Sequence, residues 1–115
     1  MSKRGDRELL IDMLESIRRV QMYVDGLEYQ DFINDIKTQD AVIRALEILG
    51  EASKRMSPSI KSQFPDVPWK LMAGMRNKLI HEYFGVNLDV VWEVVTNSLP
   101  ALFSQIECIL IGEAE

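Results

Sequence analysis

Apolar residues recur at intervals of three and four along almost the whole chain, and no other feature of the sequence restricts the fold as much. Because an α-helix turns once in about 3.6 residues, side chains at these intervals line one face and can be buried together. A strand would need apolar and polar residues to alternate, and no stretch does so for long enough to indicate a sheet. The sequence therefore predicts an all-α fold.

Four long segments carry the helical pattern: residues 10–27, 38–56, 69–80 and 88–110. Short connections between such amphipathic helices favour an antiparallel bundle. Residues 29–36 also hold apolar side chains, in either a short helix or an ordered turn, and the sequence leaves both open. We expect a single domain over residues 1–115 with about four to five helices, because a chain of this length has room for one core.

Breaks between the helices are marked by proline, glycine and capping residues. Three prolines punctuate residues 57–68, so this connection is expected to be the least regular part of the chain, because proline removes a backbone donor and disfavours helix before it. Asp66 and Asn87 are candidate caps for the helices that follow them. Gly85 is a fitting end for the third helix, and Pro100 is expected to kink the last one.

The composition is that of an ordinary globular protein, with 47% apolar and 27% charged residues. No apolar stretch approaches the roughly 18 residues that span a bilayer, and the first residues lack the apolar core of a signal peptide. The sequence thus predicts a soluble, cytoplasmic protein with no membrane partner. Cys108, the one cysteine, is expected in the core, and Trp69 and Trp92 in the core or a dimer interface.

The net charge of −5 argues at first against a nucleic-acid partner, but the charges are unevenly distributed. Residues 54–78 carry six Lys and Arg against a single acidic residue, whereas residues 79–115 carry six acidic residues and no Lys or Arg. This basic segment is either a phosphate-attracting surface or a solvated loop without a ligand, and the sequence alone does not separate the two.

His81 is the only histidine, so acid or base chemistry near neutral pH would depend on it. The sequence has no cysteine and histidine cluster at metal-ligand spacing and no glycine-rich phosphate loop, so no metal or other cofactor is expected. A histidine near a helix C-terminus can also be a simple cap that the helix dipole favours, and spacing does not exclude that role.

The residues around His81 are unusually polar for the end of an amphipathic helix, and read R-N-K-L-I-H-E-Y from Arg76 to Tyr83. At about 100° per residue, Asn77 and His81 share a face, and Tyr83 lies near the azimuth of Arg76. Arg76 and His81 are roughly 140° apart. They would converge on one phosphate through the reach of the arginine, a loosened helix end or a second copy of the chain.

The run R-N-K-L-I-H-E-Y fits the R-x4-H-x-Y signature of the HEPN superfamily. The longer run G-M-R-N-K-L-I-H-E-Y-F-G-V-N-L-D-V-V-W, residues 74–92, resembles the HepT branch of that superfamily. So do A-L-E-I-L-G-E-A at residues 45–52, Pro68-Trp69 and Leu99-Pro100. The resemblance covers nearly the whole chain.

This resemblance implies a homodimeric helical ribonuclease that acts as the toxin of a type VII-like toxin–antitoxin pair and is neutralised by an MNT nucleotidyltransferase. It places Arg76 and His81 in the catalytic positions and Asn77 in a supporting one. Tyr83 takes the place of the tyrosine that the nucleotidyltransferase modifies with AMP. Glu51 also matches the family pattern, but its role is not revealed by the sequence, and a surface carboxylate is an equal interpretation.

The leading hypothesis is a metal-independent ribonuclease toxin with a two-fold dimer site. Two-fold symmetry would supply two histidines and two arginines to one site. Together these groups could take the 2′-OH proton, protonate the leaving oxygen and stabilise the charge on phosphorus. Lys54, Arg55 and Lys78 are candidate contacts to RNA phosphates. The alternative is a non-catalytic HEPN module that binds a nucleotide or a nucleotidyltransferase, and an inactive scaffold dimer is the third hypothesis.

Overall fold

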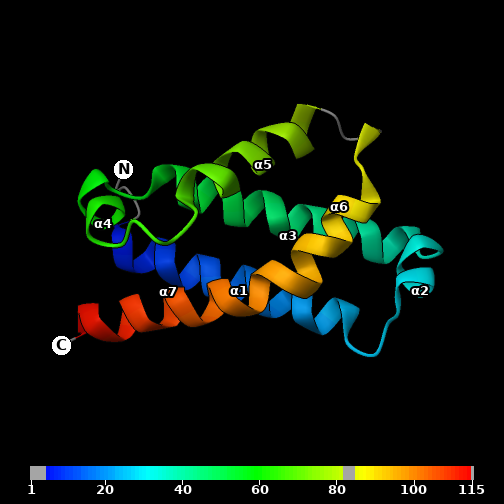
Figure 1. Ribbon diagram of the computed structural model, residues 1–115, viewed down its shortest axis with the longest axis horizontal. Coiled ribbons are helices and arrows are strands. Elements are labelled where there is room, and N and C mark those ends of the chain that lie inside the picture. The colour runs from blue at the N-terminus through cyan, green and yellow to red at the C-terminus, as the bar shows by residue number, and fades with distance from the viewer. Residues whose placement is uncertain (1–4, 82–84, 115) are drawn as a thin grey trace.

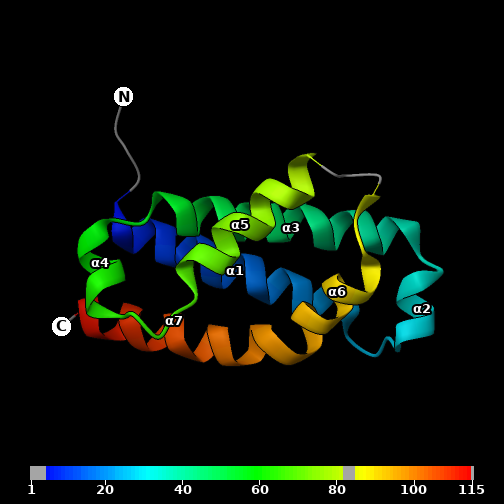
Figure 2. The same cartoon turned by 45° about the horizontal axis from the view of Figure 1, so that its top comes forward.

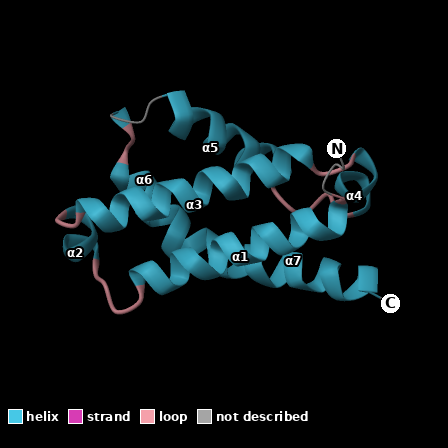
Figure 3. Ribbon diagram, turned by 180° about the vertical axis from the view of Figure 1, so that it is seen from behind, coloured by secondary structure: helices cyan, strands magenta, loops and turns pink. Residues whose placement is uncertain are grey.

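The computed structural model describes residues 5–81 and 85–114, and these ranges contain helices and connections but no strand (Figure 3). The predicted all-α fold is confirmed. In chain order the elements are α1 (Asp6–Val24), α2 (Tyr29–Ile33), α3 (Ile36–Arg55), α4 (Pro58–Gln63), α5 (Trp69–His81), α6 (Leu88–Glu93), the π-helical segment η2 (Val94–Ser98) and α7 (Leu99–Ala114).

The long helices run in alternating directions along one axis, as expected for an antiparallel bundle (Figure 1). α3 returns along α1, and α7 packs on α1 from another side. α5 lies diagonally across α3, so that its C-terminal end rises away from the bundle towards the start of α6 (Figure 2). This arrangement leaves α5 with one face on α3 and the rest of its circumference open to solvent or to η2 and α7.

The core is formed where α1, α3 and α7 meet, and its apolar residues follow the predicted helical spacing. Met13, Met56 and Met72 are buried in this core, and Met75 packs against it. The largest fully buried side chains are Phe32, Leu10, Met13, Ile17, Leu46, Leu49, Leu99 and Ile106.

The helix ends confirm one predicted cap and correct two other predictions. The side chain of Asn87 accepts from the backbone amides of Asp89 and Val90, so it caps α6 as expected. The proline-rich connection is more regular than predicted, because Ser57 caps a short helix, α4, that Pro58 begins. α5 begins at Trp69, directly after Pro68, which leaves Asp66 too early in the chain to cap it.

Cys108 is exposed on α7, and the prediction that it lies in the core is wrong. The buried face of α7 is set by Leu102, Ile106 and Ile109, and Cys108 lies two residues from Ile106, on the far side of the helix. Trp69 is buried as predicted, and Trp92 packs on Phe32 with ring centroids 5.2 Å apart.

A π-helical segment, η2, ends at Ser98, two residues before Pro100, for which the sequence predicted a kink. With α6 and α7 it makes one helical run of 25 residues, Leu88–Gly112, in which a stretch of 18 residues has a mean hydropathy of 1.4. By length and composition this run could cross a membrane, contrary to the expectation that no stretch is apolar enough. Core helices of soluble proteins pass the same test. The α7 part of this run packs on α1, and 28% of its apolar stretch is buried.

Candidate active site

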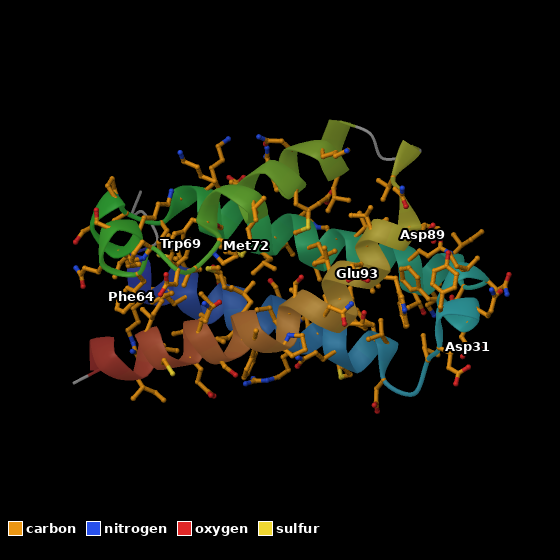
Figure 4. All side chains as sticks on the ribbon, viewed as in Figure 1. Asp31, Phe64, Trp69, Met72, Asp89 and Glu93 are labelled. Carbon is orange, nitrogen blue, oxygen red and sulfur yellow. The ribbon has the colours of Figure 1, made fainter. Side chains whose placement is uncertain are left out.

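The helix that carries the predicted catalytic residues, α5, is anchored at its first residue. The indole Nε1 of Trp69 donates to the carbonyl of Phe64 at 3.0 Å, and the hydroxyl of Ser53 donates to the carbonyl of Trp69 at 2.9 Å. The side chains of Trp69 and Met72, both on α5, are buried (Figure 4). These contacts fix the start of α5 on α3 and so determine which residues of the two helices meet further along.

α3 and α5 come so close at Gly50 that no side chain fits between them. A Cβ atom on Gly50 would lie 2.3 Å from the Cβ of Arg76 and 2.6 Å from the carbonyl oxygen of Met72. Both distances are much shorter than an ordinary van der Waals contact. The glycine of the G-E-A motif thus lets the backbone of α5 rest on α3 at Arg76, one residue away from Glu51.

Arg76 is held from two sides. Its Nε lies 3.0 Å from Oε2 of Glu51, and its Nη1 donates to Oδ1 of Asn77 at 2.9 Å. Nε and Oε2 are both shielded from solvent, although the N–H points too far aside for a hydrogen bond, so the contact is an ion pair. The side chain of Arg76 as a whole remains 24% exposed. Its guanidinium has five N–H donors, more than these two contacts require.

A charged cleft of about 230 Å³ surrounds the Arg76–Glu51 pair, between α1, α3 and α5. Glu47 and Arg44 lie one and two turns before Glu51 on α3 and form a second ion pair at 3.5 Å. Arg55 lies one turn after it. The lining residues are Leu9, Asp12, Arg44, Glu47, Ile48, Glu51, Ala52, Arg55 and Arg76. An arginine among alternating charges in a cleft is suited to an anionic ligand such as a phosphate.

The other side of α5 borders a larger groove, of about 600 Å³, against η2 and α7. Its walls are mostly apolar, with Met75, Leu99 and Leu102 among them. Two of the apolar side chains along it are open to solvent, Leu71 at 76% exposed and Val90 at 58%. α5 therefore separates a charged cleft from an apolar groove.

The predicted phosphate contacts do not form one patch. Arg55 shares the charged cleft with Arg76, whereas Lys78 lines the apolar groove on the opposite side of α5. Lys54 is exposed near the end of α3, where its carbonyl accepts from the Nζ of Lys61 at 3.4 Å. Of the three candidates, only Arg55 lines the same cleft as Arg76.

His81 is the last residue of α5, five residues after Arg76. Its side chain and the whole of Tyr83 lie outside the described residues, so their predicted roles remain predictions. Within the described ranges, no three His, Cys, Asp or Glu side chains are grouped so that they could hold a metal ion. Glu51 is the residue that sequence reasoning left without a role, and the G-E-A motif was the signal for it.

Comparison with known proteins identifies the family. The model of the HepT-like family, described as ribonuclease HepT-like, matches residues 13–109. The chain belongs to the HepT-like ribonuclease family. A Thermococcus cleftensis protein named as a probable ribonuclease HepT is 45% identical over 91% of this chain and 96% of its own length. Two Methanocaldococcus jannaschii proteins with RNase names are 41% and 42% identical, over 96% and 95% of this chain and 91% and 100% of their own lengths.

No solved structure matches this HepT-like chain. The matched region extends from within α1 to within α7, and it includes the G-E-A motif on α3 and the whole of α5. The resemblance expected from R-x4-H-x-Y is thereby confirmed at the level of the family. The Arg76–Glu51 pair and the cleft around it belong to the region that the family model matches.

Proposed function

We propose that this HepT-like protein is a metal-independent endoribonuclease that acts in the cytoplasm as the toxin of a type VII-like toxin–antitoxin system. The observation that carries the proposal is the placement of Arg76 in a charged cleft, supported by Glu51 and Asn77, on the helix that ends at His81. Family membership and the RNase names of relatives support the same activity.

The proposed reaction is attack of an RNA 2′-hydroxyl on the adjacent phosphorus. The new bond is 2′-O to phosphorus, the 5′-oxygen leaves, and the product is a cyclic phosphate. One histidine takes the 2′-OH proton and another protonates the leaving oxygen, while Arg76 stabilises the charge that gathers on the phosphoryl oxygens. Arg55 in the same cleft is suited to a neighbouring phosphate.

The reaction needs two histidines and the chain has one, so we propose that the site is completed by a second copy of the chain. The apolar groove beside α5 supports this, because Leu71 and Val90 are large apolar side chains left exposed on its walls. A second copy seated there would place the two α5 helices side by side, with a His81 at the end of each.

The dimer is tested with a matched pair of charge substitutions. Leu71 and Ile36 are similarly exposed, at 76% and 71%, but only Leu71 lines the groove. Leu71→Glu should give a monomer by light scattering and lose RNA cleavage, because it places a charge in an apolar interface. Ile36→Glu should stay dimeric and active. A parent protein that cuts RNA as a 13.2 kDa monomer would refute the composite site.

The activity is tested by incubating purified protein with RNA in EDTA. The parent should cleave the RNA, and His81→Ala should abolish cleavage and growth inhibition while leaving the helix content unchanged. Arg76→Ala should do the same. RNA left whole by the folded parent dimer would refute the nuclease and support the non-catalytic binding module instead. Cleavage by His81→Ala at the parental rate would refute the mechanism.

We further propose that an MNT nucleotidyltransferase silences the toxin by transferring AMP from ATP to the hydroxyl of Tyr83, which loses its proton while pyrophosphate leaves. The added phosphate would repel RNA and pair with Arg76, so both substrate and catalytic cation would be lost. Intact-mass analysis after co-expression should show adducts in whole AMP units that vanish in Tyr83→Phe. An unmodified Tyr83 in a fully inhibited complex would refute covalent control and favour occlusion by the partner.

A further inference from the structure

We propose that Glu51 is a positioning residue, which holds the guanidinium of Arg76 in the orientation that the transition state requires. The inference rests on the proposed ribonuclease function, because it assigns to Glu51 a role that acts through Arg76. The carboxylate comes from α3 and the arginine from α5, so the ion pair connects the catalytic helix to the centre of the bundle.

Two of the three guanidinium nitrogens of Arg76 contact neighbouring side chains, and the rest of the group remains available to a ligand. Glu51 lies against Nε, and Asn77 accepts from Nη1. With these atoms occupied, the planar group cannot rotate about its long axis without losing one contact, and the remaining N–H donors keep a fixed direction. A bidentate contact to phosphate needs such a fixed plane.

Three observations distinguish this ion pair from an incidental one on the surface. The interacting atoms Nε and Oε2 are shielded from solvent, whereas exposed pairs are open to water and contribute little. Gly50 removes the side chain that would keep α5 away from α3 at this level. The side chain of Arg76 is 24% exposed, whereas that of Arg44 in the neighbouring Arg44–Glu47 pair is 72% exposed. The backbone is arranged so that this carboxylate and this arginine meet.

The negative charge of Glu51 allows a positioning role to be distinguished from a long-range electrostatic effect. A carboxylate beside a phosphate site repels RNA, so its removal should strengthen RNA binding if long-range electrostatics were its main effect. If Glu51 positions Arg76, removal of its carboxylate should instead lower kcat, while KM is unchanged or lower. Glu47 lines the same cleft and carries the same charge but pairs with Arg44 instead, so Glu47→Gln is the matched control.

The kinetic experiment compares Glu51→Gln, Glu51→Ala and Glu47→Gln with the parent dimer on one RNA substrate. Glu51→Ala should lower kcat roughly 100-fold, the size of effect that a misplaced catalytic group produces, and Glu51→Gln about 10-fold because its amide oxygen keeps part of the contact. Glu47→Gln should keep the parental kcat. Thermal unfolding would verify that each variant is folded. A kcat in Glu51→Gln equal to that in Glu47→Gln would overturn the proposal.

Two further measurements separate this proposal from the proposed function. In an Arg76→Lys background, which keeps a small residual rate of cleavage, Glu51→Gln should change kcat far less than it does in the parent, because the planar group that Glu51 positions is absent. In the protein without RNA, the Nε–H resonance of Arg76 should shift and exchange faster with water in Glu51→Gln but not in Glu47→Gln. A parent that fails to cut RNA would refute the ribonuclease, whereas an unchanged Arg76 resonance would refute the role of Glu51.

Discussion

Replacing Gly50 by alanine tests the close approach of α3 and α5 on which the site depends. The added Cβ would lie 2.3 Å from the Cβ of Arg76, roughly 1.2 Å short of the distance of about 3.5 Å at which carbon atoms touch. It would also lie 2.6 Å from the carbonyl oxygen of Met72, a backbone atom that cannot rotate away. The two helices must therefore separate by about an ångström.

The change in the free energy of unfolding caused by Gly50→Ala is the sum of two opposing effects. Alanine within a helix is favoured over glycine by about 0.5–1 kcal/mol, because glycine loses more backbone entropy on folding. Overpacking of a close contact costs about 1–3 kcal/mol, and contact with the backbone favours the upper half of that range. Gly50→Ala should therefore lower the free energy of unfolding by about 1–2 kcal/mol. It should also lower kcat roughly 100-fold, because Arg76 moves with α5.

Urea and thermal unfolding measure the loss, with Gly74→Ala and Gly112→Ala as controls. Both control glycines are helical, and a Cβ on either would meet no atom within 4 Å. These two variants should therefore be as stable as the parent or more stable by about 0.5–1 kcal/mol. If Gly50→Ala were stabilised as much as the controls, the two helices would not be in the contact described, and the explanation of the G-E-A motif would fail.

Three other predictions follow from local geometry. Arg76→Lys should restore little of the cleavage lost in Arg76→Ala in the EDTA assay, because an ammonium cannot reproduce a planar fork on phosphate. Gly26→Ala should lower the free energy of unfolding by about 1 kcal/mol in urea, because Gly26 has a φ of +77° after the end of α1, and Gly26→Asn should lose less. Hydrogen bonds from the hydroxyl and amide of Thr38 hold the pKa of Asp35 below its ordinary value of 3.8. Asp35 therefore stabilises the fold above pH 3.8, and this contribution is lost as the pH falls through the lower folded pKa. Asp35→Asn should be less stable than the parent near neutral pH, with the difference shrinking in acid unfolding curves; a constant difference would contradict this.

Features that depend on a short stretch of chain could be predicted from the sequence. The helices follow from apolar spacing because each buries one stripe, whatever its neighbour is. Asn87 caps α6 through its own next three residues, so its role needed no tertiary information. The family could also be recognised, because R-x4-H-x-Y and its flanks are contiguous in the chain.

Features that depend on which side of a helix the bundle covers could not be predicted. Cys108 lies in an apolar run, but α7 presents Ile106 and Ile109 to the core and leaves Cys108 outside. Lys78 and Arg55 belong to one basic segment, yet α5 places Lys78 on the groove and Arg55 stays beside the cleft. Sequence spacing gives the azimuths of residues relative to one another on a helix, but it does not say which side of that helix the bundle covers.

The sequence by itself determined that this chain is a helical bundle with a HepT-like motif on its third long helix. Only the tertiary structure decided that Glu51 meets Arg76, since the two residues lie on different helices and their meeting depends on the depth to which α5 settles on α3. That depth is set by the missing side chain of Gly50 together with the anchoring of Trp69 by Ser53. A carboxylate without an evident role in the sequence thereby becomes the residue that holds the catalytic arginine in our proposal.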